Sequence, residues 1–182
     1  MVQRIAAVAL LAMIGYTAKA QVTQGSFLAG GSLSFSSEKY SEGGTAKNRL
    51  TIAPNAGYFF IDKLAGGLKT SFSSYKADGD SYTNFAAGPF ARYYFLPVEK
   101  KTNVLLEGSF LFGSEKYDGF EAEGKTQIGI AAGPAFFLNQ FVAVEALLGW
   151  QSVKHKDDAG RYNNFGLSIG FQVHLSGKKK MK

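Results

Sequence analysis

The chain has 182 residues, of which 46 % are hydrophobic and 19 % are charged, so the composition excludes a disordered chain and does not indicate a helical membrane protein. It has no cysteine, which excludes a disulfide framework, a thiolate metal site and a cysteine nucleophile. The 22 glycines and the aromatic content of 14 % are typical together of β-structure with close backbone approaches.

The formal net charge of +6 comes from the two ends of the chain. Arg4 and Lys19 lie near the start, and Lys178, Lys179, Lys180 and Lys182 form a basic C-terminal tail over residues 178–182. Residues 21–177 carry equal numbers of acidic and basic side chains. A nucleic-acid partner requires a basic patch on the folded body, so the sequence predicts none.

Residues 1–20 have the pattern of a secretory signal peptide. Arg4 supplies the positive start, residues 5–14 form an apolar run too short for a transmembrane helix, and residues 18–20 fit a small-x-small cleavage site. The mature chain is expected to begin at Gln21 and to leave the cytoplasm. The alternative interpretation of this segment is a buried N-terminal helix.

Eight stretches with a period of two follow the leader, each with one bulky apolar face. They cover residues 27–35, 50–60, 64–72, 84–95, 104–112, 128–138, 142–150 and 165–175. No position on the bulky faces is charged. The opposite faces hold glycine, serine, alanine and amides, with five formal charges: Arg49, Lys69, Arg92, Glu107 and Glu145.

This asymmetry distinguishes two kinds of barrel. A soluble barrel fills its interior with bulky groups and covers its exterior with charge, whereas a membrane barrel has bulky groups outside and small or polar groups inside. The pattern therefore predicts an all-β fold, an eight-stranded antiparallel up-and-down transmembrane β-barrel over residues 21–177 with lipid as its surroundings. A soluble sandwich or barrel is the alternative.

The connections between the stretches alternate in length. Short ones are expected around residues 61–63, 97–102 and 139–140, and long polar ones around 38–47, 76–82, 114–125 and 152–161. This alternation is typical of periplasmic turns and extracellular loops, with the first and last strands paired to close the barrel. The strand assignment is weakened by three prolines within the stretches, because proline cannot donate a ladder hydrogen bond: Pro54, Pro89 and Pro134. A bulge or a lipid-facing ring is expected at each.

Aromatic residues gather where two interface girdles are expected, because a ring with a polar tip suits the boundary between lipid and water. The girdle before the short turns comprises Tyr58, Phe60, Tyr93, Phe95 and Phe136, and the girdle beside the long loops comprises Phe35, Phe72, Phe85, Phe112, Trp150 and Phe165.

Three segments carry a family resemblance: 57–64 (GYFFIDKL), 88–95 (GPFARYYF) and 133–137 (GPAFF). With them the mature chain resembles the OmpX/OmpA-like outer membrane protein β-barrel domain family over essentially its whole length. The resemblance implies an eight-stranded barrel in a Gram-negative type outer membrane, but no particular activity, because that family is functionally diverse. Many such barrels end on an aromatic residue, whereas this chain continues past Leu175 into its basic tail.

The inward charges predict an ion-pair network. Arg92 and Glu107 lie at mirror positions about the turn near residues 99–100, so their side chains should meet across neighbouring strands. Lys69 and Glu145 lie at similar depth. Eight strands leave an interior that side chains fill, so the network, with Arg49, is expected to plug the lumen. Its role is either scaffolding or a gate.

The sequence gives less support to catalysis and to metal binding. Ser152, His155 and Asp157 would be the candidate residues of an outer-membrane lipid-modifying enzyme, but polar loops contain such residues by chance, so no catalytic residue, metal or cofactor is predicted. Residues 78–80 (Asp-Gly-Asp) lack the ligand spacing of a calcium loop and indicate a turn.

The repeated Ser-Glu-Lys-Tyr at 37–40 and 114–117 has two interpretations. Either the strands continue beyond the membrane, or a protruding sheet presents Tyr40, Tyr75 and Tyr117 to an extracellular protein or surface ligand. The function expected is structural or surface interaction with a filled lumen, and the alternatives are a narrow porin-like channel and the lipid enzyme.

Overall fold

Eight strands form where the alternation predicts them. The computed structural model describes residues 22–38, 47–77, 80–117, 122–156 and 159–176. The strands are β1 (Phe27–Glu38), β2 (Lys47–Ile61), β3 (Leu64–Ala77), β4 (Asp80–Tyr94), β5 (Thr102–Tyr117), β6 (Glu123–Phe137), β7 (Val142–His155) and β8 (Tyr162–Leu175). Within these ranges no helix is long and apolar enough to cross a membrane.

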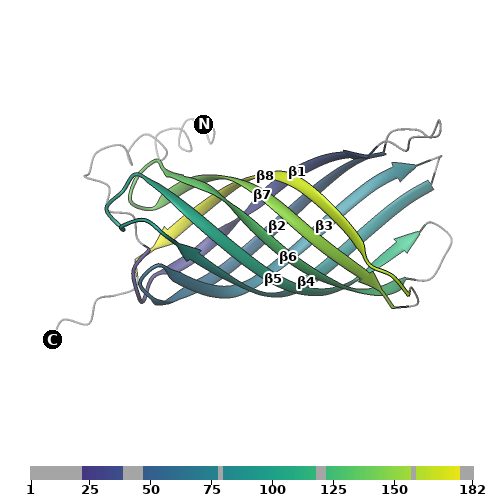
Figure 1. Ribbon diagram of the computed structural model, residues 1–182, viewed down its shortest axis with the longest axis horizontal. Helices are drawn as coiled ribbons and strands as arrows, with labels where there is room; N and C mark the ends of the chain where they lie inside the picture. The colour runs from purple at the N-terminus through teal and green to yellow at the C-terminus, as the bar shows by residue number, and fades with distance from the viewer. Residues whose placement is uncertain (1–21, 39–46, 78–79, 118–121, 157–158, 177–182) are drawn as a thin grey trace, which may run out of the picture.

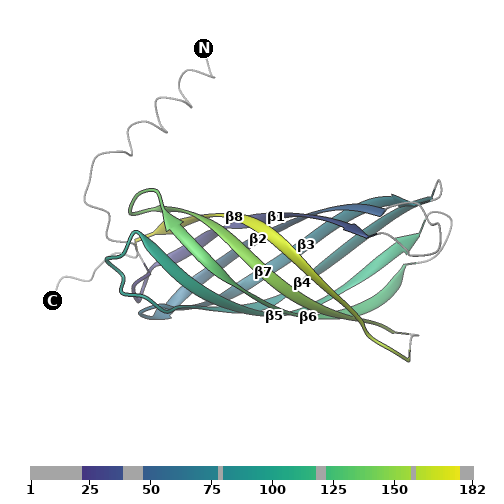
Figure 2. The same cartoon turned by 45° about the horizontal axis from the view of Figure 1, so that its top comes forward.

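The strands close into one antiparallel barrel in sequence order, with β8 paired to β1 (Figures 1 and 2). Phe27 pairs with Tyr58 on one side and with Leu175 on the other, so β1 closes the sheet. The short connections lie at one end, the turn side, and the others lie at the opposite end, the loop side (Figure 1). The predicted fold class is confirmed.

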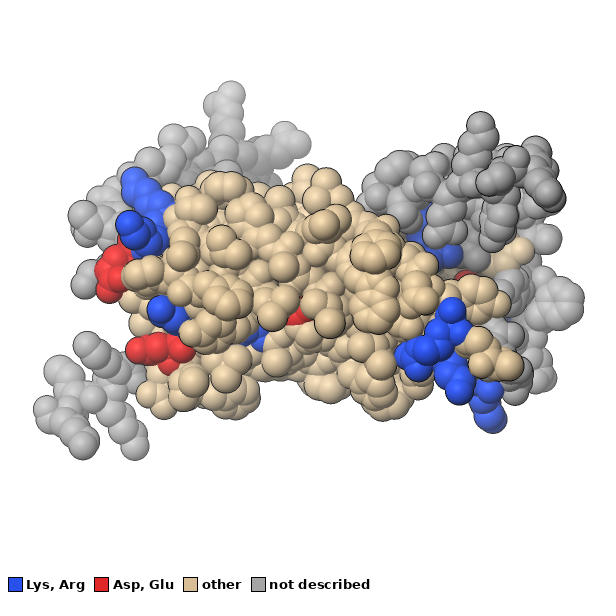
Figure 3. Space-filling view, viewed as in Figure 1, with Lys and Arg blue, Asp and Glu red and all other residues tan. Residues whose placement is uncertain are grey.

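The two faces of the sheet differ as the period of two requires. None of the bulky-face side chains that the structure describes is buried, and many large ones are at least half exposed, among them Leu68 at 68 % and Phe165 at 74 %. Charged residues gather at the two ends of the barrel, and the middle of the face in Figure 3 is almost free of them. A broad uncharged belt therefore surrounds the barrel.

The loop side differs from the prediction. Long loops were expected around residues 76–82, 114–125 and 152–161, but β3, β5 and β7 continue to Ala77, Tyr117 and His155. Ala77 pairs with Asp80, so only residues 78 and 79 join β3 to β4, a length typical of a hairpin. The strands continue beyond the apolar belt with polar residues, because backbone pairing does not require the apolar alternation.

The three prolines are accommodated without a bulge. The β4–β5 pairing skips Gly88 and Pro89 and resumes at Phe90 in the same register, and the β6–β7 pairing skips Gly133 and Pro134 likewise. The absent side chain at Gly88 lets β4 approach β5, because a Cβ there would come within 2.9 Å of the Leu111 Cα. Each proline costs ladder bonds locally and faces outward.

Candidate functional site

An ion-pair floor crosses the lumen near mid-height. It consists of Lys69, Arg92, Glu107 and Glu145, from β3, β4, β5 and β7. Arg92 Nε donates to Glu107 Oε2 at 2.9 Å, and Arg92 Nη1 donates to both Glu145 oxygens at 2.9 and 3.1 Å. Arg92 Nη2 also bonds Glu107, and Lys69 Nζ lies 2.5 Å from Glu107 Oε1. Two cations thus balance two carboxylates.

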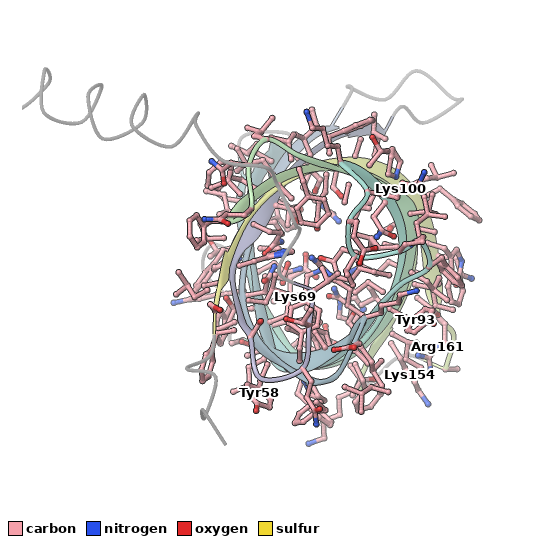
Figure 4. All side chains as sticks on the ribbon, turned by 90° about the vertical axis from the view of Figure 1, so that its left-hand side faces the viewer. Tyr58, Lys69, Tyr93, Lys100, Lys154 and Arg161 are labelled. Carbon is pink, nitrogen blue, oxygen red and sulfur yellow. The ribbon has the colours of Figure 1, made fainter. Side chains whose placement is uncertain are left out.

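Burial makes this pairing necessary. Arg92 and Glu107 are each 2 % exposed and Glu145 is 1 % exposed, so each would carry a large desolvation penalty without its partners. Register brings Arg92 directly opposite Glu107, as the mirror positions predict. Lys69 points into the ring of strands, whereas Tyr58 and Tyr93 point outward (Figure 4).

The structure separates Arg49 from this floor. Arg49 lies on β2 towards the loop side and lines the cavity described below, where its charge acts on Glu115 and Lys125. Tyr94, which the sequence analysis did not select, joins the floor instead: its hydroxyl donates to Glu145 Oε1 at 3.2 Å and it is fully buried. Its signal in the sequence is the spacing from Arg92, since residues two apart share a strand face.

A base seal fills the lumen between the floor and the turn side. It is built from bulky inward side chains that are each at most 5 % exposed: Val22, Leu28, Phe59, Tyr94, Leu105, Phe137 and His174. The His174 ring packs edge-on against Phe59 and Phe137, with centroids 5.8 and 5.2 Å apart. The seal therefore closes the lumen with packed rings.

The segment before β1 folds into the turn side and adds to the seal. Lys63 N donates to Val22 O at 2.8 Å, Gly25 N donates to Phe59 O at 2.9 Å, and Gln24 N donates to Asp62 Oδ1 at 2.8 Å. These bonds hold Val22 in the barrel mouth, where none of its surface is exposed. The predicted cleavage site before Gln21 lies outside the described residues, as does the basic tail.

The loop-side half of the lumen is hollow, which corrects the expectation of a filled interior. A cavity of about 900 Å³, here called the vestibule, extends from the ion-pair floor to the loop side. Parts of its wall are thin because many of the inward positions there are glycine or serine. These include Ser32, Ser34, Ser71, Ser73, Ser109, Gly129, Gly149, Gly166 and Ser168. Bulky inward residues are concentrated in the base seal instead.

The vestibule rim holds a second group of charges. Glu115 Oε2 lies 3.7 Å from Lys125 Nζ and 3.0 Å from His155 Nε2. His155 also packs edge-on against Tyr162 at 5.7 Å. Within the described ranges no group of three His, Cys, Asp or Glu residues is placed to hold a metal.

Ser152 and His155 lie on opposite faces of β7. His155 lines the vestibule, whereas Ser152 Oγ accepts a hydrogen bond from Arg161 Nε at 2.9 Å, and Arg161 lies on the outside (Figure 4). Three residues separate them, and an odd spacing in a strand places side chains on opposite faces. The two do not form a nucleophile–base pair; Asp157 lies outside the described residues.

The predicted girdle residues whose side chains the structure describes lie on the outer face. On the turn side Tyr93 packs against Phe95 with centroids 5.1 Å apart, and on the loop side Phe72 packs against Phe85 at 4.8 Å. The side chains of Phe35, Tyr75 and Tyr117 and the whole of Tyr40 lie outside what the structure describes, so the proposed tyrosine surface stays a prediction.

Comparison with known proteins identifies the fold. No protein-family model matches the chain, and no curated protein matches its sequence. Neisserial surface protein A is similar in structure, with a TM-score of 0.61 and 15 % identity over 82 % of this chain and 97 % of that one. The N-terminal β-barrel domain of Pseudomonas aeruginosa OprF has a TM-score of 0.56, with 13 % identity over 84 % and 98 %. Pseudomonas aeruginosa OprG has 0.54, with 10 % identity over 87 % and 99 %.

Proposed function

We propose that this chain, which has the fold of the OmpA/OmpX-like eight-stranded outer-membrane barrels, is an integral outer-membrane protein with a structural or surface-interaction role and no catalytic activity. Its turn side faces the periplasm and its loop side faces the exterior. The uncharged belt supports this location, because so many exposed bulky side chains are stable only in an apolar medium.

The observation that carries the role is the closed base of the lumen. The vestibule ends at the ion-pair floor, and beneath it Phe59, Tyr94 and Leu105 of the base seal have no exposed surface. An ion would have to cross packed rings and a neutral cluster of paired charges. This arrangement favours a barrel that preserves the permeability barrier over a porin-like channel.

Single-channel recording in planar bilayers tests this role. The wild-type barrel is expected to show no steady conductance. Truncation of a seal ring in Phe59→Ala is expected to create conductance, whereas truncation of an outward ring in Phe60→Ala, a matched control on the next residue, is not. Steady conductance of the wild-type protein would contradict the closed base and support the channel.

The extended loop-side strands support the surface role. β5 continues five residues past Phe112 to Tyr117, and β7 continues five residues past Trp150 to His155, so polar sheet extends beyond the girdle. Such a sheet offers an extracellular protein or surface ligand a rigid platform rather than a loose loop. Protease treatment of intact cells tests the orientation: cuts are expected within the loop-side connections, and cuts confined to the turn side would contradict it.

A further inference from the structure

The contact between β1 and β8 is incomplete on the loop side. Their pairing runs from Phe27–Leu175 to Ser34–Ser168 and stops there. β1 continues to Glu38 paired with β2, and β8 begins at Tyr162 paired with β7. The two strands diverge toward the loop side in both views (Figures 1 and 2). We call the stretch between residues 35–38 and 162–167, over which β1 and β8 share no backbone ladder, the β1–β8 opening.

The β1–β8 opening begins at the depth of the outer leaflet, given the membrane location proposed above. Eight paired residues per strand at about 3.3 Å each give about 26 Å, which a strand tilt of about 40° reduces to roughly 20 Å of height. The apolar band of a membrane barrel is about 25 Å tall. With the first pair, Phe27–Leu175, taken as the inner edge of the hydrocarbon, pairing ends roughly 5 Å below its outer edge.

An apolar groove on the outer surface lies against the paired part of β1 and β8, and its upper end at Leu33 and Ile169 is one residue pair below the last pair before this opening. It has a volume of about 400 Å³ and crosses β2, β1, β8 and β7, with Leu33, Pro54, Ile169 and Phe171 in its walls. It is hollow because Gly31 faces outward without a side chain, and a Cβ there would meet the Pro54 backbone at 2.9 Å. The groove lies within the belt, so its surroundings are lipid chains.

The vestibule reaches the same opening from the inside. Ser32 lines both the groove and the vestibule, and Ser34 and Ser168, the last paired residues, line the vestibule. An apolar surface outside the wall and a polar surface inside it thus lie back to back across β1 at Ser32, two residue pairs below the end of the backbone pairing. A ligand that contacts both must be amphiphilic.

The chemistry of the vestibule limits the polar part of that ligand. The charged residues that line it are Arg49, Lys69, Lys125 and His155 against Glu107, Glu115 and Glu123, so with neutral histidine the lining carries no net charge. Most of the remaining wall is hydroxyl or amide. This lining suits an uncharged polyol or a zwitterion.

We propose that the barrel binds a single-chain amphiphile from the outer leaflet, with its chain in the groove and its zwitterionic or hydroxyl-rich headgroup in the vestibule, reached through the β1–β8 opening. The proposal uses the membrane location proposed above but does not depend on whether the base conducts. It goes beyond that role by naming a ligand class and an entry route.

Photolabelling with a lysophosphatidylcholine that carries a diazirine on its headgroup tests the proposal, with the full barrel in lipid nanodiscs. The headgroup is expected to label the inward residues Asn164 and Ser168. Glycerophosphocholine, which has the headgroup without the chain, is expected not to compete. Labelling confined to the outward Phe165 and Leu167 would overturn the proposal, and competition by glycerophosphocholine would instead indicate a soluble solute entering from the loop side.

A cross-link over the opening tests the route. Because β1 and β8 diverge past Ser34–Ser168, a bismaleimide with a reducible spacer, rather than a direct disulfide, joins Ser36→Cys to Gly166→Cys, and the chain has no other cysteine. The cross-linked protein is expected to lose headgroup labelling and to regain it when the spacer is reduced. The control Thr83→Cys/Lys116→Cys links register partners of β4 and β5 and is expected to label like the wild type. Unchanged labelling of the cross-linked Ser36→Cys/Gly166→Cys protein would overturn the route.

A second variant tests the entry route if the two cysteines cannot be cross-linked. Gly166→Phe puts a ring into the vestibule beside the opening, at a position where a Cβ meets no atom within 4 Å. It is expected to abolish headgroup labelling, whereas Gly108→Phe, equally open but facing outward on β5, is expected to leave it unchanged. Retained labelling of Gly166→Phe would overturn the proposal. Failure of the wild-type barrel to insert into nanodiscs would count against the membrane location instead.

Discussion

Replacement of Arg92 by methionine removes the cation that contacts both buried carboxylates of the ion-pair floor. Glu107 keeps Lys69 at 2.5 Å, but Glu145, which is 1 % exposed, loses its paired cation and keeps neutral neighbours such as the Tyr94 hydroxyl at 3.2 Å. Removal of one partner from a buried ion pair typically costs about 3–5 kcal/mol, because the remaining charge is uncompensated. We expect Arg92→Met to lower the free energy of unfolding by that amount.

The double variant Arg92→Met/Glu145→Gln tests the reason for this loss. It removes one positive and one negative charge and leaves the Lys69–Glu107 pair intact, so the ion-pair floor holds no unpaired carboxylate. We expect it to be more stable than Arg92→Met by about 2–3 kcal/mol, within the range of coupling energies for contacting residues. Lys69→Met is the milder control, at about 1 kcal/mol or less, since Lys69 is 18 % exposed and Arg92 remains on Glu107.

Urea unfolding in lipid vesicles measures these differences, with Trp150, the single tryptophan, as the fluorescent probe. The unfolding free energies can be compared only if their dependence on urea concentration, the m-value, is the same in each variant as in the wild type. A double variant as unstable as the sum of its single variants would refute the reasoning, because it would show that Arg92 and Glu145 do not compensate each other.

Two further predictions use the same assay. Ala146→Arg places a charge on the outward face of β7 and is expected to cost about 2–4 kcal/mol, whereas Gln127→Arg, whose side chain enters the vestibule, is expected to cost clearly less; equal losses would contradict the assignment of faces. Lys63 has a φ of 69° in the turn after β2, so Lys63→Gly is expected to stabilise the barrel by up to about 1 kcal/mol and Lys63→Ala is not; equal effects of the two would contradict backbone strain there.

The sequence was sufficient to predict the barrel fold because the pattern that specifies a barrel strand is local. Bulky residues alternate with small ones in every strand, and a period of two assigns each side chain to a face before any contact is known. The pairing of Arg92 with Glu107 follows from the same rule plus a short turn, since a tight connection sets the register. Continuation of β5 to Tyr117 was one of the two interpretations of the Ser-Glu-Lys-Tyr repeat, whereas the extensions of β3 and β7 were missed because their residues, such as Lys76, are polar and pairing leaves no apolar pattern.

The shape of the lumen depended on information that the alternation does not carry. Knowing that Gly149 and Gly166 face inward does not show that they lie side by side, which makes that wall thin and the vestibule wide. The sequence analysis grouped Arg49 with the floor residues because the alternation gives the strand face of Arg49 but not its position along the barrel axis. The end of the β1–β8 pairing at Ser34 is a property of two strands distant in sequence, and no local pattern encodes it.

Cysteine accessibility tests most directly whether lipid surrounds the bulky face. Single cysteines are introduced at the outward Leu68 and Ile130, which are 68 % and 50 % exposed, and at the inward Thr51 and Ser109, which line the vestibule. In lipid vesicles with the loop side outward, a membrane-impermeant maleimide is expected to label the inward pair and to spare the outward pair. Rapid labelling of the outward pair with protection of the inward pair would contradict the account.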